Sequence, residues 1–422
     1  MEKKQYESIV RLLHRELVPA LGCTEPIAIA YAAAALKQAL GAMPEHVDAA
    51  CSGNIIKNVQ GVIVPGTGNL RGVQASVAMG LLCGDMSLEL EVLSKAVPAD
   101  VVKAKEMIDA GFCDVSILNS DEPLHIVLTG TVGEDSAVAE VRGGHTDLVR
   151  LEKNGVLLSS MDASESEEEF SGVAMLSSEV VYEFAQTFEI EDLKALLDRQ
   201  MQHNLAIAEE GLKNAWGGAV GATLLKCRGD DVRTRACAYA AAGSDARMSG
   251  CMLPVVINSG SGNQGLTVSL PVITYAKELQ ATEEQLYRAL AFSNLMALQQ
   301  KQYIGKLSAF CGAVCAGCGA GAGIAYLLGF TLPEIESVVM NTLAIVSGMV
   351  CDGAKASCAG KIATSVNAAI LSVDMTAQKH AFDPGTGILG KCEADTVSNI
   401  GRMAQDGMKE TDKVVLNIMI GK

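Results

Sequence analysis

Cysteine is the residue type whose spacing in this chain points most directly to chemistry. The sequence holds 13 cysteines, and five of them fall in one Gly/Ala-rich stretch, at Cys311, Cys315, Cys318, Cys351 and Cys358. Small residues leave room near the backbone for a bulky group, which an inorganic cluster needs and a disulfide does not. We therefore expect this stretch to hold an iron–sulfur cluster.

Cys351 and Cys358 lie in the segment CDGAKASCAGK, between the end of one predicted helix and the start of the next. The backbone is expected to turn at Asp352-Gly353, and amides at a helix N-terminus stabilise a thiolate. Cys311 would complete a set of three ligands, which leaves one iron of a four-iron cluster open to bind substrate as a Lewis acid. The spacing also allows a zinc site or a set of buried structural cysteines.

Cys315 and Cys318 follow Cys311 at helical spacing, so all three fall on one face of a predicted helix. Small buried cysteines are common in protein cores. Two roles stay open for this pair: packing inside the helix, or replacement of Cys311 as a ligand.

Cys23 is the fourth candidate, in the motif GCTEP just before an Ala-rich predicted helix. A helix N-terminus lowers the pKa of a nearby thiol and favours the thiolate. Cys23 is therefore a candidate base or nucleophile, with a buried cysteine at a helix start as the alternative.

Two polar loops, CSGNIIKN and NSGSGNQG, come before predicted helices. Backbone amides of the second loop are suited to an anion-binding nest for a small carboxylate. Neither loop follows a nucleotide-binding pattern. The alternative for each is a tight connection between elements.

The elements that must position these motifs are mostly predicted helices, and strand-like alternation gathers between about residues 115 and 152. We predict a mainly α protein with an inserted α+β domain. Residues 1–84 and 176–422 form a Gly/Ala-rich helical catalytic domain around the cluster site. Residues 85–175 form the insertion, which ends in the acidic exit linker MDASESEEEFSG.

Composition limits the partners of this 422-residue chain. A net charge of −16 opposes binding to nucleic acid or anionic lipid, which need clustered Lys and Arg. The uncharged window 307–333 is long enough to span a bilayer, but its six glycines and three cysteines favour a buried helix pair. Many cysteines without a signal-peptide pattern indicate a reducing cytoplasm. The six histidines form no metal-ligand pattern, so no catalytic histidine is expected.

The motifs GCTEP, CSGNIIKN, NSGSGNQG and CDGAKASC occur in this order along nearly the whole chain. Together they resemble the L-cysteine desulfidase family (UPF0597), which is related to the α-domain of iron–sulfur L-serine dehydratases. The resemblance implies a [4Fe-4S] cluster held by Cys311, Cys351 and Cys358, and it implies a catalytic role for Cys23.

The resemblance further implies a carbon–sulfur lyase that uses no pyridoxal phosphate and converts L-cysteine to sulfide, pyruvate and ammonium. In this reaction the open iron is the Lewis acid and Cys23 the candidate base. Candidates for holding the carboxylate and amine of the substrate are Ser52, Asn54, Asn258, Ser259 and Ser261. Alternatives are L-serine dehydration by the same mechanism and a non-enzymatic iron–sulfur or zinc redox sensor. We expect a small amino acid as partner, no nucleic acid and no membrane, with a homodimer as the candidate assembly.

Overall fold

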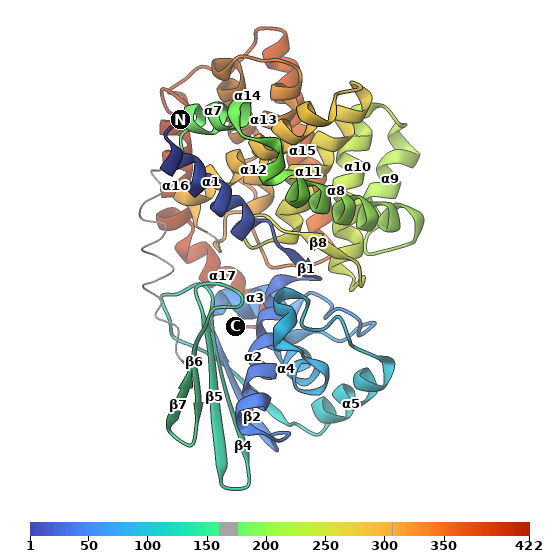
Figure 1. Cartoon of the computed structure of the whole chain (residues 1–422), viewed down its shortest axis with the longest axis vertical. Coiled ribbons are helices and arrows are strands. Elements are labelled where there is room, and N and C mark those ends of the chain that lie inside the picture. The colour runs from blue at the N-terminus through green and yellow to red at the C-terminus, as the bar shows by residue number, and fades with distance from the viewer. Residues whose placement is uncertain (160–175, 306) are drawn as a thin grey trace.

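The computed structural model describes residues 1–159, 176–305 and 307–422. These residues form a larger helical lobe and a smaller lobe that is built on a sheet (Figure 1). The prediction of a mainly α protein with an α+β region is confirmed. The acidic segment 161–172, predicted as the exit linker, lies outside the described residues.

The smaller lobe holds a six-stranded sheet in the order β3-β2-β4-β5-β6-β7. Its strands are β2 (His46–Cys51), β3 (Cys113–Ile117), β4 (His125–Val132), β5 (Asp135–Arg142), β6 (Leu148–Lys153) and β7 (Val156–Ser159). β2 and β3 run parallel, and the other neighbours run antiparallel. Burial alternates along β4 and β5, as expected for a sheet with one face packed against helices.

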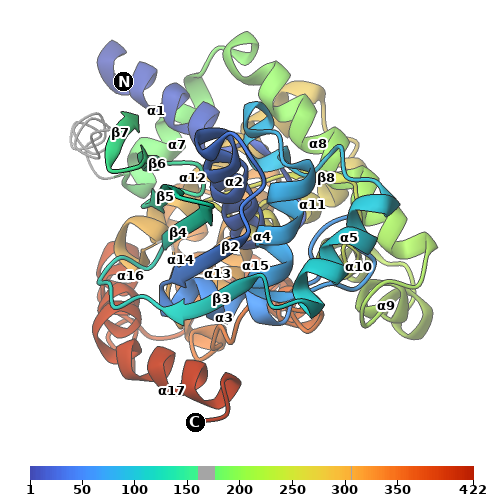
Figure 2. The same ribbon diagram turned by 90° about the horizontal axis from the view of Figure 1, so that it is seen from below.

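Helices cover the sheet and connect it to the larger lobe, as the view from below shows (Figure 2). The helical elements of the smaller lobe are α2 (Thr24–Leu40), α3 (Gly53–Gln60), α4 (Gly72–Cys83), the 3-10 helix η1 (Met86–Glu91) and α5 (Pro98–Asp109). α2 packs against β4, β5 and β6, and α4 lies between α2 and α5.

The division between the lobes differs from the predicted domain boundary after residue 84. β2 lies inside the sheet between β3 and β4, and α2 and α4 pack on that sheet. Among residues 1–84, α1 (Lys3–Glu16) and β1 (Pro19–Leu21) lie with the helical lobe, where β1 pairs with β8 (Pro254–Val256). The buried Ala-rich surface of α2 can pack on a sheet as well as on helices, so helical periodicity alone does not identify its partner.

The helical lobe is organised around the Gly/Ala-rich helix α13. Its helices are α7 (Ser178–Thr187), α8 (Ile190–Lys213), α9 (Val220–Arg228), α10 (Val232–Met248), α11 (Gly262–Glu278), α12 (Glu283–Ile304), α13 (Gly312–Leu327), α14 (Leu332–Val346), α15 (Cys358–Ala377) and α16 (Glu393–Arg402). α13 contacts α11, α12, α14 and α15. A Cβ on Gly319 would lie 2.6 Å from the backbone oxygen of Ser293 in α12, so only glycine permits this close approach.

The uncharged window 307–333 contains α13 and the first residues of α14. The interior of α13 is buried among its neighbouring helices. Within the described ranges, no helix combines the length and apolar character that crossing a bilayer requires.

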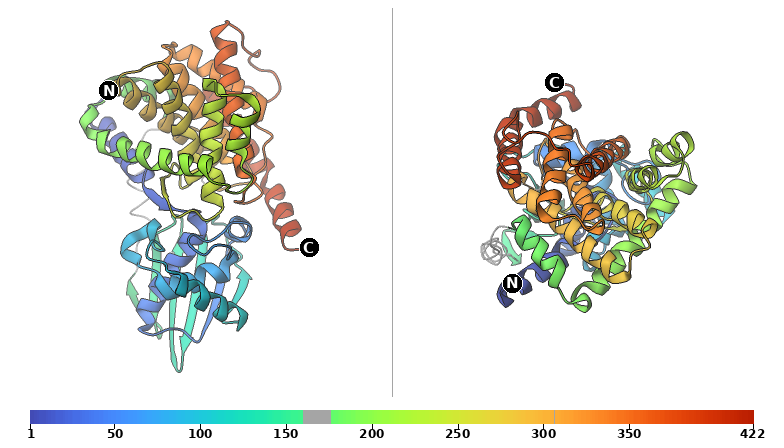
Figure 3. Two further views of the ribbon diagram at one scale, coloured as in Figure 1. Left: turned by 90° about the vertical axis from the view of Figure 1, so that its right-hand side faces the viewer. Right: turned by 90° about the horizontal axis from the view of Figure 1, so that it is seen from above.

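The C-terminal end of the chain returns to the smaller lobe. After the π-helical turn η2 (Met403–Gly407), helix α17 (Lys409–Met419) lies beside α3 (Figure 3). There Lys57, which is 1% exposed, forms an ion pair with Asp412. A buried ammonium needs such a partner, so this ion pair holds α17 against the smaller lobe.

Candidate active site

A cavity of about 680 Å³ lies where the two lobes meet. The smaller lobe and the helical lobe both contribute polar, charged and sulfur-containing side chains to its lining. These include Cys23, Glu25, Asn58, His145, Arg247, Ser259, Ser261, Asn263, Gln264, Cys311, Cys351, Cys358 and Lys361.

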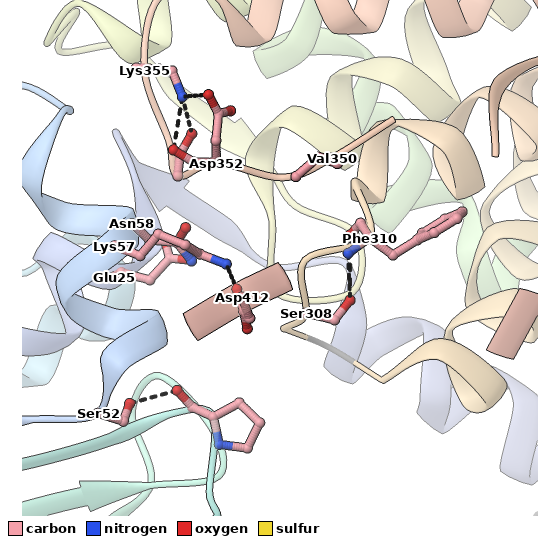
Figure 4. A network of polar contacts seen from close by, with 12 residues as sticks. Glu25, Ser52, Lys57, Asn58, Ser308, Phe310, Val350, Asp352, Lys355 and Asp412 are labelled. Carbon is pink, nitrogen blue, oxygen red and sulfur yellow. Dashed lines mark hydrogen bonds and ion pairs between the residues drawn. The ribbon is translucent and has the colours of Figure 1, made fainter. Parts of the chain in front are cut away.

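Cys311 and Cys351 are brought together by an antiparallel bridge between two segments that lie 40 positions apart in sequence. The backbone N–H of Cys311 donates to the Met349 oxygen at 3.1 Å, and that of Cys351 donates to the Ala309 oxygen at 2.7 Å. Figure 4 labels Phe310 and Val350, the two residues that form this bridge. The two sulfur-bearing residues are therefore held by backbone hydrogen bonds rather than by side-chain packing alone.

Cys358 reaches the same place from the first turn of α15. Its backbone N–H donates to the Lys355 oxygen at 2.9 Å, which closes the turn that begins at Cys351. Asp352 in this turn forms ion pairs with Lys355 and Lys361. The Lys361 ammonium also donates to the Val350 oxygen at 2.8 Å, so it fixes the turn beside the cysteines.

The three thiols at the cavity affect one another's protonation. Burial raises the pKa of the Cys311 thiol, and the neighbouring Cys351 and Cys358 raise it further. The pKa of Cys358 is raised by burial and by Cys351 as well. Three thiolates confined in this way repel one another unless a cation compensates them, and thiolates are the ligands that iron–sulfur clusters use. The residues present therefore fit a cluster.

Cys315 and Cys318 lie on α13 but do not line the cavity. Both side chains are fully buried inside the helical lobe. Burial raises the pKa of each thiol. The structure thus places this pair in the core, apart from the three cysteines at the cavity.

Cys23 is the N-cap residue of α2, at the helix start that the sequence predicts, and it lines the cavity. Its Sγ donates to Glu25 Oε2 at 3.0 Å, and Asn58 Nδ2 donates to Glu25 Oε1 at 3.0 Å. Thr24 Oγ1 lies 3.1 Å from Glu25 Oε2 and 2.9 Å from the Gly260 oxygen. The Glu25 carboxylate therefore accepts hydrogen bonds from three side chains, and one of these bonds orients the Cys23 thiol.

The protonation of this pair differs from what a helix N-terminus alone suggests for Cys23. Burial and the Glu25 charge raise the pKa of the Cys23 thiol well above its ordinary value, although Arg247 opposes them. Burial also acts to raise the pKa of the Glu25 carboxyl, but His145, the Cys23 hydrogen bond and Arg247 outweigh it and lower that pKa. The proton therefore resides on sulfur and the negative charge on Glu25.

The predicted substrate-binding residues separate into two groups. Ser259 and Ser261 line the cavity. Asn258 is buried behind them, where its Nδ2 donates to Asn294 Oδ1 at 3.0 Å. Ser52 and Asn54 lie outside the lining, and Ser52 Oγ donates to the Pro123 oxygen at 2.6 Å (Figure 4).

Several cavity residues were not identified from the sequence. Asn58 is the residue of the segment CSGNIIKN that lines the cavity, and it lies four positions beyond Asn54. His145 arrives from the turn between β5 and β6, and a Cβ on Gly260 would lie 3.0 Å from its Cε1. Arg247 lies in the last turn of α10. Isolated residues of this kind carry no spacing signal, because only the fold brings them together.

Gly353 fixes the turn that carries two of the cysteines. Its φ is +89°, and a Cβ there would lie 2.3 Å from the backbone oxygen of Lys57. Gly353→Ala is expected to lower the free energy of unfolding by about 2 kcal/mol or more, because it adds backbone strain and an overlap with α3. Denaturant unfolding checks the loss of stability, and iron binding after reconstitution checks the displacement of the turn.

The matched control for Gly353→Ala is Gly360→Ala in the first turn of α15, where a Cβ would meet no atom within 4 Å. That control should unfold at the same or a slightly higher denaturant concentration, since alanine favours helix over glycine. Equal stability of the two variants would contradict the role given to Gly353.

The fold and the cavity define a two-lobed, mainly α protein with a three-cysteine pocket at the lobe junction. Residues 87–417 match the family model described as serine dehydratase alpha chain. A UPF0597 protein of Lachnoclostridium phytofermentans is 47% identical over 415 residues, covering 98% of this chain and 100% of that protein. UPF0597 proteins of Desulfitobacterium hafniense (47% identical, covering 100% of this chain and 98% of that protein) and Finegoldia magna (45%, covering 99% and 100%) are similar along their length.

The chain therefore belongs to the serine dehydratase alpha chain family and to the UPF0597 proteins. The family relationship expected from the four motifs is confirmed. Membership supports a lyase-like role for the cavity.

Proposed function

We propose that this protein is an iron–sulfur-dependent lyase that converts L-cysteine to sulfide, pyruvate and ammonium. The observation that carries the proposal is the convergence of Cys311, Cys351, Cys358 and Cys23 on one cavity. The match to the serine dehydratase alpha chain supports the reaction class, because sulfide loss and water loss are both β-eliminations from an amino acid.

Three thiolates, those of Cys311, Cys351 and Cys358, would hold the cluster. A [4Fe-4S] cluster bound by three cysteines supplies one iron without a protein ligand, which acts as a Lewis acid toward the leaving group. Lys355 and Lys361 each form an ion pair with Asp352, and these ion pairs hold the turn that carries the ligands.

The other residues of the cavity hold and move protons. Cys23 is the proposed acceptor of the Cα proton, after its own proton passes to Glu25 along the existing 3.0 Å hydrogen bond. Asn58 keeps the Glu25 carboxylate in position for that transfer. Loss of the Cα proton and of sulfide gives aminoacrylate, which tautomerises and takes up water to give pyruvate and ammonium.

A second candidate reaction is the dehydration of L-serine. The specific observation in its favour is the description of the matching family as serine dehydratase alpha chain. The same base and the same cluster would serve, with hydroxide in place of sulfide as the leaving group.

Turnover by the anaerobically reconstituted full chain tests the proposal. We expect sulfide and pyruvate in equal amounts from L-cysteine, with a kcat/KM at least about 10-fold above that for L-serine, because thiolate is the better ligand for iron. The opposite ratio would assign the protein as a serine dehydratase. A cluster without turnover of either amino acid would contradict both reactions and favour a redox sensor.

A further inference from the structure

Arg247 is a buried cation at the cavity that the proposed reaction leaves without a role. Its side chain is 2% exposed, yet it lines the cavity with Cys23 and the three cluster cysteines. In the described part of the chain, no group accepts a hydrogen bond from its Nε or Nη2. A buried guanidinium without an acceptor is costly, so such a group is expected to receive an anion from a ligand.

The Arg247 charge lowers the pKa of the Glu25 carboxyl, but Glu25 accepts no hydrogen bond from Arg247 Nε or Nη2. Both Glu25 oxygens are engaged, by Cys23 and Thr24 on one side and by Asn58 on the other. No ion pair joins Glu25 to Arg247 among the described residues. Nε and Nη2 of Arg247 thus have no hydrogen-bond acceptor in the described part of the chain, although the residue lines the cavity.

The start of α11 adds a second anion-binding element beside Arg247. A Cβ on Gly262, the first residue of α11, would lie 2.3 Å from Arg247 Nε and 2.7 Å from its Cζ. The guanidinium therefore lies against the helix N-terminus, and only glycine leaves it room. The N-cap residue Ser261 makes no side-chain capping bond, so the first amides of α11 also lack an acceptor inside the helix.

Two amide oxygens complement this positive site. Gln264 is 5% exposed and lines the cavity, and its Oε1 has no hydrogen-bond donor among the described residues. Asn263 Oδ1 is likewise without a donor in the described ranges. The Gln264 amide lies against Gly312, because a Cβ on Gly312 would be only 2.8 Å from the Cδ of Gln264. Gly312 directly follows Cys311 in the sequence. Hydrogen-bond acceptors thus lie between the guanidinium and the cysteines.

We propose that Arg247 and the start of α11 bind the α-carboxylate of the substrate, and that Gln264 and Asn263 accept hydrogen bonds from its α-ammonium group. Guanidinium and carboxylate match in a two-bond planar geometry, which a lysine does not reproduce. Amide oxygens suit an ammonium group, which has only donors. The site therefore favours free zwitterionic α-amino acids and binds more weakly the compounds that lack one of the two charged groups. The identity of the substrate rests on the proposed function, but the pairing of each charge with its residue does not.

The test uses two thiols that cannot undergo the reaction, each with one of the two charges. 3-Mercaptopropionate keeps the carboxylate and lacks the amine, and cysteamine keeps the amine and lacks the carboxylate. Anaerobic calorimetric titration of the cluster-containing full chain measures both affinities. Arg247→Gln should weaken 3-mercaptopropionate about 100-fold and leave cysteamine within about 2-fold, since two charge-assisted hydrogen bonds are lost. Arg247→Lys should retain part of the affinity for 3-mercaptopropionate.

Gln264→Leu should show the reverse selectivity, with cysteamine weakened about 10-fold and 3-mercaptopropionate little changed. Arg233→Gln is the matched control, because Arg233 lies on the same helix α10 but pairs with Asp374 on the exposed surface. This control should change neither affinity.

Equal loss of both probes in Arg247→Gln would overturn the proposal and make Arg247 a residue that supports the cavity as a whole. Unchanged affinity for both probes would overturn it too. These binding results are separable from the proposed function, since charge-selective binding without sulfide release would reject the lyase reaction and keep the binding site.

Discussion

Cys351→Ala is expected to leave the protein without a stable cluster and to lower elimination from L-cysteine by at least about 1,000-fold. The reason is geometric, because Cys351 is held next to Cys311 by the backbone bridge and its side chain shares the cavity with Cys358. Two remaining thiolates cannot replace a set of three. Iron and sulfide content, the visible spectrum and sulfide release measure the loss under anaerobic conditions.

Cys318→Ala provides the matched control for this variant. Cys318 is as close in sequence to Cys311 as Cys358 is to Cys351, but it is fully buried in α13 away from the cavity. The control should keep its iron and its turnover, with only a modest loss of stability for a small deleted group. Loss of the cluster in Cys318→Ala with retention in Cys351→Ala would reverse the ligand assignment.

The meeting of Cys311, Cys351 and Cys358 at one cavity could be expected from the sequence because its signals are local. Gly/Ala-rich residues around Cys311, and the turn between Cys351 and Cys358, mark places where the backbone must bend or approach closely. The structure shows the reason at Gly353, where a side chain would overlap the backbone of α3. Cys23 was also predictable, since GCTEP marks a helix start and the structure places Cys23 at the N-cap of α2.

The remaining parts of the site depend on contacts between the lobes, for which the sequence offers no spacing signal. Asn58 was missed in favour of Ser52 and Asn54 because all three lie on one polar segment, and only packing decides which one faces the cavity. His145 comes from a hairpin turn and Arg247 from a helix end, each without a neighbouring motif.

The packing of residues 24–84 on the sheet was not expected from the sequence, for a related reason. β2 is a short apolar run far from the other strands in sequence, yet it lies between β3 and β4 in the sheet. Strand pairing across such a distance is set by the tertiary structure, and single-strand patterns do not specify it. Residues 24–84 were therefore assigned to the helical domain although they pack on the sheet.

The protonation of Cys23 leads to the second large effect. Because its thiol carries the proton and Glu25 the charge, the proposed reaction uses the two residues as a pair, and removing the sulfur removes the proposed acceptor for the Cα proton. Cys23→Ala is expected to lower kcat for L-cysteine by about 1,000-fold, within the range usual for loss of a general base. It should also abolish exchange of the Cα hydrogen with D₂O, which NMR follows directly.

Glu25→Gln separates the two members of the pair. It keeps a side chain of the same size that can still contact Asn58, but it removes the carboxylate that receives the thiol proton from Cys23. We expect a smaller loss in kcat, about 100-fold, with the visible spectrum of the cluster unchanged in both variants. Cys23→Ser should be as slow as Cys23→Ala, because a hydroxyl holds its proton more tightly than a thiol does. Full Cα exchange in Cys23→Ala would show that another group, rather than this sulfur, removes the proton.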